Sequence, residues 1–123
     1  MRAKPAAMPA AAVCHIPIFS MTVFEDSAKR DARNVPAGLM CRDARKLAEL
    51  FARHNVKLAL SGHMHQVDRI KFRELTFICD GAVSGKWWKG PFKGFEAGFG
   101  VLDLAADGSL RHQYHDYGWT PKT

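Results

Sequence analysis

The sequence predicts an α/β fold in its front part and an antiparallel β extension behind it. An apolar strand, an amphipathic helix and a second apolar strand follow one another between Ala11 and Ser61, as in a βαβ unit. After His65 the pattern changes to short strands, and the pair Asp107-Gly108 is typical of a β-hairpin turn. With 123 residues, 47% hydrophobic and 24% charged, the chain has the size and composition of one small globular domain.

The first twelve residues form a leader that we expect to be poorly ordered. It begins basic and becomes Ala-rich, but prolines interrupt it and it lacks the Leu-rich centre of a secretory signal. The apolar run Ala11 to Ile18 predicts a buried strand that Pro17 ends. Phe19 to Ala37 is then a long connection, which indicates either a functional rim or a partly helical segment.

Apolar residues recur at helical spacing among charged ones between Gly38 and His54, which predicts an amphipathic helix. His54 closes this helix, where the helix dipole favours an imidazole. The short apolar run Val56 to Ser61 predicts the second strand, and it leads directly into Gly62-His63-Met64-His65.

The rear part of the chain shows strand patterns separated by a glycine-rich loop with two adjacent indoles. The strands are expected over Gln66 to Phe72, Leu75 to Cys79, Gly98 to Leu104 and Leu110 to Tyr117, and the loop over Gly81 to Pro91. We divide the chain into the leader (1–12), the front part (13–80) and a β extension of the same domain (81–119).

Three histidines are the candidate metal ligands. Side chains two residues apart point to the same side of an extended backbone, so His63 and His65 would face one way and Met64 the other. His15 also stands at the end of an apolar strand, and successive strand ends deliver side chains to one edge of a sheet. Imidazole suits zinc, iron, copper and nickel, although a lone histidine at a strand end is more often an ordinary polar residue. His112 and His115 are expected on the surface without partners.

Two blocks of this sequence resemble the last two metal-ligand blocks of the calcineurin-like metallophosphoesterases. These are Val13-Cys14-His15-Ile16-Pro17-Ile18, a lone histidine after a hydrophobic strand, and the Gly-His-x-His sequence at Gly62 to His65. The segment Ser84-Gly85-Lys86-Trp87-Trp88 and the strands after it resemble the C-terminal extension of one bacterial branch of that family, whose members are often exported. The resemblance covers roughly Ala11 to Trp119 and implies a partial metallophosphoesterase-type sandwich.

The resemblance implies a phosphomonoester or phosphodiester substrate and two divalent ions of the manganese, iron or zinc class. Such ions lie about 3.5–4 Å apart, where they polarise the ester and activate water. By similarity, His15 and His63 would bind one ion and His65 the other.

The sequence departs from the family in its earlier ligand blocks. No Asp-x-His, Gly-Asp or Gly-Asn-His occurs in it. Three neutral imidazoles cannot offset the repulsion between two divalent cations, so we expect at most one ion here, with water in its open position. We therefore expect the chain to be the C-terminal half of a metallophosphoesterase, from a truncated, split or mis-started reading frame. We expect such a half to be inactive alone, and we assign no catalytic residue in it. Its expected partner is the missing N-terminal half.

Two other function classes stay open. The first is a non-catalytic remnant in which the histidines hold a single ion. The second is a polyanion or nucleic-acid binder that uses the net charge of +6 together with Trp87, Trp88, Lys86, Lys89 and Lys93. The basic residues are scattered rather than clustered, which makes nucleic acid unlikely as a partner. We expect one indole to be packed and the other to lie at a rim. No apolar stretch is long enough for a membrane span.

Overall fold

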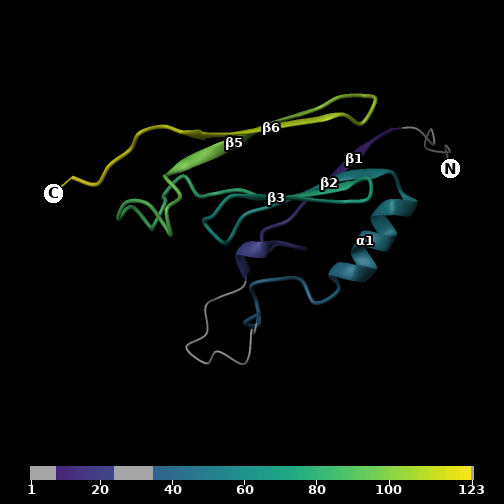
Figure 1. Cartoon of the computed structure of the whole chain (residues 1–123), viewed down its shortest axis with the longest axis horizontal. Coiled ribbons are helices and arrows are strands. Elements are labelled where there is room, and N and C mark those ends of the chain that lie inside the picture. The colour runs from purple at the N-terminus through teal and green to yellow at the C-terminus, as the bar shows by residue number, and fades with distance from the viewer. Residues whose placement is uncertain (1–7, 24–34, 123) are drawn as a thin grey trace.

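A computed structural model describes residues 8–23 and 35–122 of the chain. In chain order its elements are β1 (Ala10–Val13), the 3₁₀ helix η1 (Met21–Val23), α1 (Ala44–Arg53), β2 (Val56–Ser61), β3 (Asp68–Phe72), β4 (Leu75–Cys79), β5 (Gly98–Leu104) and β6 (Leu110–Asp116). A four-stranded sheet forms the middle layer, with α1 on one face and the β5–β6 hairpin along the other (Figure 1). The predicted mixed α/β class is confirmed.

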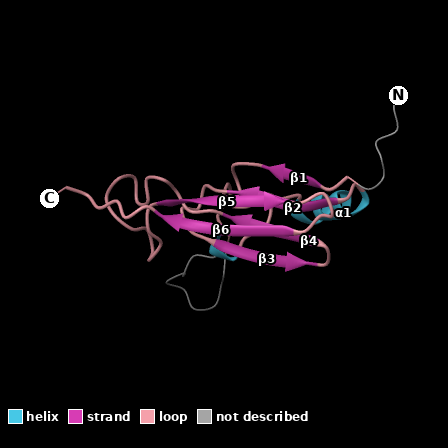
Figure 2. Cartoon of the chain, turned by 90° about the horizontal axis from the view of Figure 1, so that it is seen from above, coloured by secondary structure: helices cyan, strands magenta, loops and turns pink. Residues whose placement is uncertain are grey.

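The four-stranded sheet has the order β1-β2-β4-β3. β2 runs parallel to both β1 and β4, and β3 runs antiparallel to β4. The parallel pair β1–β2 is connected through α1, as a parallel crossover requires. β1 and β3 lie at opposite edges (Figure 2). Every residue of β4 is buried, because the strand lies between two neighbours and both faces of the sheet are covered.

β1 lies earlier in the chain than the strand predicted over Ala11 to Ile18. Ala10 to Ala12 belong to β1, so the predicted leader extends too far, and residues 1–7 lie outside the described part of the chain. Irregular pairing continues beyond Val13, since the Cys14 N–H donates to the Leu60 carbonyl at 3.0 Å. Pro17, which is buried, has no N–H with which to extend the ladder.

The connection predicted over Phe19 to Ala37 is described only in its first and last parts, and its first part contains η1. α1 starts at Ala44, so the helix predicted from Gly38 begins too early. Residues 36–43 form turns instead, because the Leu39 N–H donates to the Pro36 carbonyl and the Cys41 N–H to the Pro17 carbonyl. His54 is the C-cap of α1, as predicted.

The main core lies between α1 and the sheet. Leu47 and Phe51 of α1 pack against the buried residues Ala59, Leu75 and Phe77. No side chain of α1 is fully buried, and a cavity of about 1080 Å³ lies beside the helix and strands β3 and β4. Neither α1 nor any other helix within the described residues has the length and apolar character needed to cross a bilayer.

The β5–β6 hairpin follows the predicted pattern, with register pairs from Gly98–Asp116 to Leu104–Leu110. Its turn is closed by the Ala105 N–H, which donates to the Ser109 carbonyl at 3.0 Å. The three strands Val56–Ser61, Leu75–Cys79 and Gly98–Leu104 have the predicted bounds, and β3 starts at Asp68 rather than Gln66.

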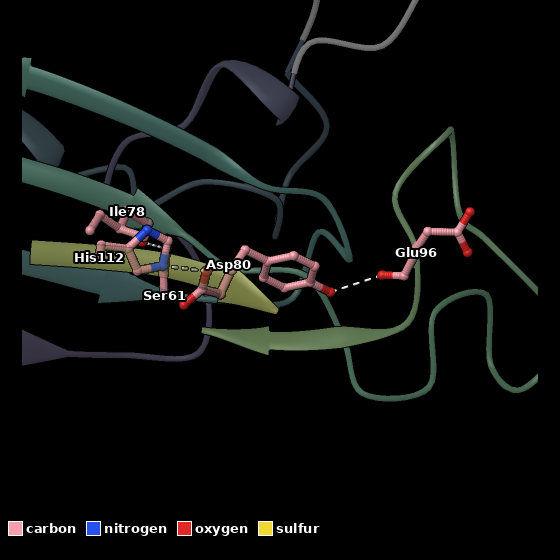
Figure 3. A network of polar contacts seen from close by, with 6 residues as sticks. Ser61, Ile78, Asp80, Glu96 and His112 are labelled. Atoms are coloured by element: carbon pink, nitrogen blue, oxygen red, sulfur yellow. Dashed lines mark hydrogen bonds and ion pairs between the residues drawn. The ribbon is translucent and has the colours of Figure 1, made fainter. Parts of the chain in front are cut away.

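A buried polar contact joins the hairpin to the sheet. The His112 Nε2 of β6 lies 2.8 Å from the Asp80 Oδ1, and the two side chains are only 7% and 18% exposed (Figure 3). Gly100 of β5 lies against the Asp80 carboxylate so closely that a Cβ at this position would overlap it. The expectation that His112 is a surface residue without a partner is therefore wrong. His115 also has a neighbour, since its ring stacks on Phe99 with 5.7 Å between the ring centroids.

Candidate metal centre

The carboxyl ends of β1 and β2 bring two of the three predicted ligands together. His15 follows β1 and His63 follows β2, and these two strands are parallel neighbours. The His15 Nε2 lies 3.0 Å from the His63 Nδ1, with the ring centroids 4.8 Å apart and the ring planes at 73°. Both residues are exposed to solvent. The pair is thus preformed and open at the end of the sheet.

Two arrangements produce this nitrogen–nitrogen distance. In a neutral pair without metal, one imidazole N–H donates to the other ring's lone pair, for which about 3.0 Å is ordinary. With metal, zinc–nitrogen bonds of about 2.0–2.1 Å at angles between a right angle and the tetrahedral one separate two ligand nitrogens by about 2.9–3.4 Å. The observed spacing is compatible with both arrangements.

His65 has different neighbours. Its Nδ1 lies 2.6 Å from the Gly85 carbonyl oxygen. A carbonyl only accepts, so Nδ1 carries the hydrogen and a neutral ring keeps its lone pair on Nε2. Histidine ligands of metals commonly have one ring nitrogen fixed in this way. The ring of His65 lies 4.7 Å from the Trp87 ring.

The backbone of this segment is not extended. His63 and His65 have φ values of 69° and 56°, in the left-handed region. The Met64 N–H donates to the Gly62 carbonyl at 2.8 Å, which closes a tight turn. The prediction from strand geometry is therefore wrong for the backbone, although Met64 does face inward, where it packs with Val23 and Cys79.

The left-handed angles at His63 and His65 are energetically unfavourable. A non-glycine residue held there costs on the order of 1–3 kcal/mol, and such residues concentrate at functional sites. The burial of Met64 between the two histidines helps to impose these angles, because the turn must place its side chain in the core.

Cys79 lies directly behind this turn but is not a ligand candidate. It is fully buried, and its Sγ donates to the Gly62 carbonyl at 3.2 Å. Burial, with a smaller contribution from the Asp68 carboxylate, raises the pKa of the Cys79 thiol to about 11. Because metals bind the thiolate, a thiol that stays neutral at physiological pH is a structural group here.

Within residues 8–23 and 35–122, no three His, Cys, Asp or Glu side chains form a group that could hold a metal ion. His15 and His63 contact each other, whereas His65 contacts Gly85 and Trp87 of the loop between β4 and β5. The described residues therefore do not support the reading in which all three imidazoles hold one ion.

The loop between β4 and β5 supplies contacts that the sequence pattern did not reveal. Gly85 is buried with φ 51°, and a Cβ there would lie 2.6 Å from the Gly90 carbonyl oxygen. This close approach accounts for the glycine in Ser-Gly-Lys-Trp-Trp and places the carbonyl that holds His65. Trp87 and Trp88 are 60% and 54% exposed, so the expectation that one of them is packed is wrong.

The Asp80–His112 contact was also missed, yet a signal for it exists. Residues 110, 112 and 114 share one face of β6 by strand alternation, and the inner face of a hairpin packed on a sheet buries its side chains. His112 lies between Leu110 and Tyr114 on that face, where a buried imidazole needs a polar partner.

Comparison of this chain with protein-family models, with characterised proteins and with solved structures finds no match.

Proposed function

We propose that this chain carries the closing histidine ligands of a metallophosphoesterase centre, and that hydrolysis requires further ligands that the chain does not contain. The observation that carries the proposal is the His15–His63 pair, with 3.0 Å between nitrogens at the ends of two parallel strands. Ligand sites in open α/β sheets lie at this edge.

The position of His65 adds support. The Gly85 carbonyl fixes the Nδ1–H of this ring so that Nε2 remains the basic nitrogen. In the proposed centre, His15 and His63 bind one ion and His65 binds a second. The metal ions of such a centre polarise the ester and lower the pKa of a bound water.

The carboxylates at this end of the sheet do not complete the centre. Asp80, directly after β4, pairs with His112. Asp68, at the start of β3, accepts hydrogen bonds from the Ser20 hydroxyl at 2.7 Å and the Met21 N–H at 2.8 Å. Asp80 and the Oδ2 of Asp68 are therefore engaged in holding the fold, whereas the Asp68 Oδ1 is buried without a hydrogen-bond partner among the described residues. Because two close cations need a bridging carboxylate, the chain alone is expected to hold one ion at most.

Hydrolysis assays test the incomplete site. The purified chain is incubated with manganese or zinc and either p-nitrophenyl phosphate or bis-p-nitrophenyl phosphate. We expect no turnover above the metal-only background. Strong hydrolysis by the chain that vanishes in His63→Ala would contradict the proposal, because it would demand a complete centre.

The DNA immediately upstream of the first codon tests the family. We expect it to encode Asp-x-His, Gly-Asp and Gly-Asn-His in that order, in frame or after a frameshift. Co-expression of the encoded segment with this chain should then give metal-dependent hydrolysis that His63→Ala abolishes. An upstream region without these blocks would argue against the family.

A single-ion, non-catalytic role is the second candidate, and the His15–His63 pair favours it equally. This candidate differs from the first in the outcome of the co-expression experiment. A chain with this role would bind a metal ion, but it would gain no hydrolytic activity when the upstream segment is supplied. The polyanion-binding alternative is supported only by the exposed indoles and lysines of the loop between β4 and β5.

A further inference from the structure

We propose that the loop between β4 and β5 binds the planar aromatic ring of a phosphoester, so that the preferred substrates of the centre are nucleotides or aryl phosphates. The proposal deepens the function proposed above and rests on it. The binding surface is an aromatic platform formed by His65, Trp87 and Phe92.

The platform has an open face. Trp87 is tilted by 36° against the His65 ring, with 4.7 Å between the centroids, and meets Phe92 edge-on at 5.5 Å. Phe92 also meets His65 edge-on at 6.0 Å. Trp87 is nevertheless 60% exposed. An indole supported on one side and open on the other is suited to stack a planar ring, since stacking gains energy from flat apolar contact.

The platform is held in place before any ligand arrives. Within the loop, the Trp88 N–H donates to the Ser84 carbonyl at 2.7 Å, and the Lys86 N–H to the Gly90 carbonyl at 2.8 Å. The left-handed φ of 49° at Trp87 is a conformation that the loop must enforce. A fixed platform loses little entropy on binding, which favours affinity.

The segment that begins on β6 fastens this loop from outside. The Tyr114 hydroxyl donates to the Glu96 carbonyl at 2.8 Å, and the Tyr117 hydroxyl donates to the Val83 carbonyl. Trp119 meets Trp88 edge-on with 5.3 Å between the centroids. The second indole thus contacts Trp119, whereas Trp87 contacts the candidate ligand His65.

The charge around the platform suits a phosphoester. The segment 81–97 contains the three lysines Lys86, Lys89 and Lys93 against one acidic residue, Glu96. The Lys93 Nζ lies 5.5 Å from the centroid of the Phe92 ring, at the edge of the platform. A ligand stacked on Trp87 would have His65 on the far side of the same indole and a cation beside it. Because Trp87 contacts His65, the bound ring would be one indole away from that candidate ligand.

The arrangement favours a single ring over a nucleic-acid strand. Binding of single strands uses a series of aromatic side chains along a basic groove. Here the two indoles have different partners, because Trp87 contacts His65 and Trp88 contacts Trp119. One base or aryl group therefore fills the platform.

Calorimetric titration of the chain tests the platform with and without zinc, using adenosine monophosphate, phenyl phosphate and ribose 5-phosphate as probes. We expect the two ring-bearing phosphates to bind more tightly than ribose 5-phosphate, and adenosine monophosphate by about 5- to 150-fold, as expected for one stacked base. Equal affinities for all three would overturn the proposal. So would a single-stranded oligonucleotide that binds far more tightly than the mononucleotide with a steep salt dependence.

Single substitutions identify which indole stacks on the ring of the ligand. Trp87→Ala should remove the preference for ring-bearing phosphates, Trp87→Phe should restore part of it, and the matched control Trp88→Ala should keep it. Circular dichroism shows which variants fold. In the unaltered chain, an NMR titration with the ligand identifies the stacked residue, because the indole N–H resonance of that residue moves. A preference that survives Trp87→Ala, or a shift confined to Trp119, would contradict the platform.

Zinc titration without a phosphate ligand distinguishes the ring-binding proposal from the metal-centre proposal on which it rests. Zinc binding with no ring preference would contradict the platform and leave the metal centre intact. A ring preference lost in Trp87→Ala without any zinc binding would contradict the metal centre and leave the platform as a ring-binding site.

Discussion

His63 and His65 owe their positions to an unusual stretch of backbone. Both have left-handed angles, and Met64 between them is buried against Val23 and Cys79. The sequence predicted the meeting of His15 with His63, because both follow apolar strands. It could not predict the turn, since alternation along a strand describes only extended chains. The turn also explains why His63 and His65 contact different groups.

The left-handed angle at His63 predicts a conflict between stability and binding. Glycine accepts this angle without strain, whereas alanine does not. His63→Gly should therefore have a free energy of unfolding about 1 kcal/mol higher than His63→Ala in urea denaturation, while neither variant keeps the metal site. Equal stabilities of the two variants would show that the angle is not enforced.

Cys79 predicts a loss of stability at alkaline pH. Its pKa is raised from 9.0 to about 11 in the native chain, so between these values the native state holds a proton that the unfolded state has released. The free energy of unfolding should therefore fall as pH rises from 9 to 11, by up to about 2–3 kcal/mol.

The control for this effect is Cys79→Ala, which should be less stable at pH 7 but should show a smaller fall over the same range. Part of the fall will remain, because burial also raises the pKa of Tyr114. A fall of the same size in both proteins would exclude Cys79 as its source.

The hairpin is joined to the four-stranded sheet by a buried polar contact. Asp80 follows the end of β4 and meets His112 on β6 (Figure 3). Gly100 on β5 leaves room for the carboxylate, because a Cβ there would overlap it. Most strands and the hairpin turn could be predicted, because apolar runs and the Asp-Gly pair are local signals. The start of α1 could not, since it depends on the long-range hydrogen bond from the Cys41 N–H to the Pro17 carbonyl.

His112→Ala should weaken the attachment of the hairpin. It leaves the Asp80 carboxylate, only 18% exposed, without its partner, which costs about 1–3 kcal/mol. The matched control is Gln113→Ala, next to it on β6 but on the exposed face. Thermal unfolding of the two variants should show a clearly lower Tm for His112→Ala only. Similar Tm values would mean that the contact contributes little.

At the scale of the whole molecule, the candidate centre and the ring-binding loop lie at the same end. β1 points toward the end of the molecule where the loop between β4 and β5 lies (Figure 2). The Gly85 carbonyl connects that loop directly to His65. The fold thus brings His15 beside His63, and His65 beside Gly85 and Trp87, although these residues are far apart in the sequence.

The central claim is that His15 and His63 together bind a divalent ion, and calorimetric titration with zinc tests it most directly. The unaltered chain should bind about one ion with a saturable heat, and His54→Ala, which removes an exposed histidine at the end of α1, should bind equally well. His63→Ala should bind at least about tenfold more weakly. Unchanged zinc affinity in His63→Ala, or no saturable binding by the unaltered chain, would contradict the claim.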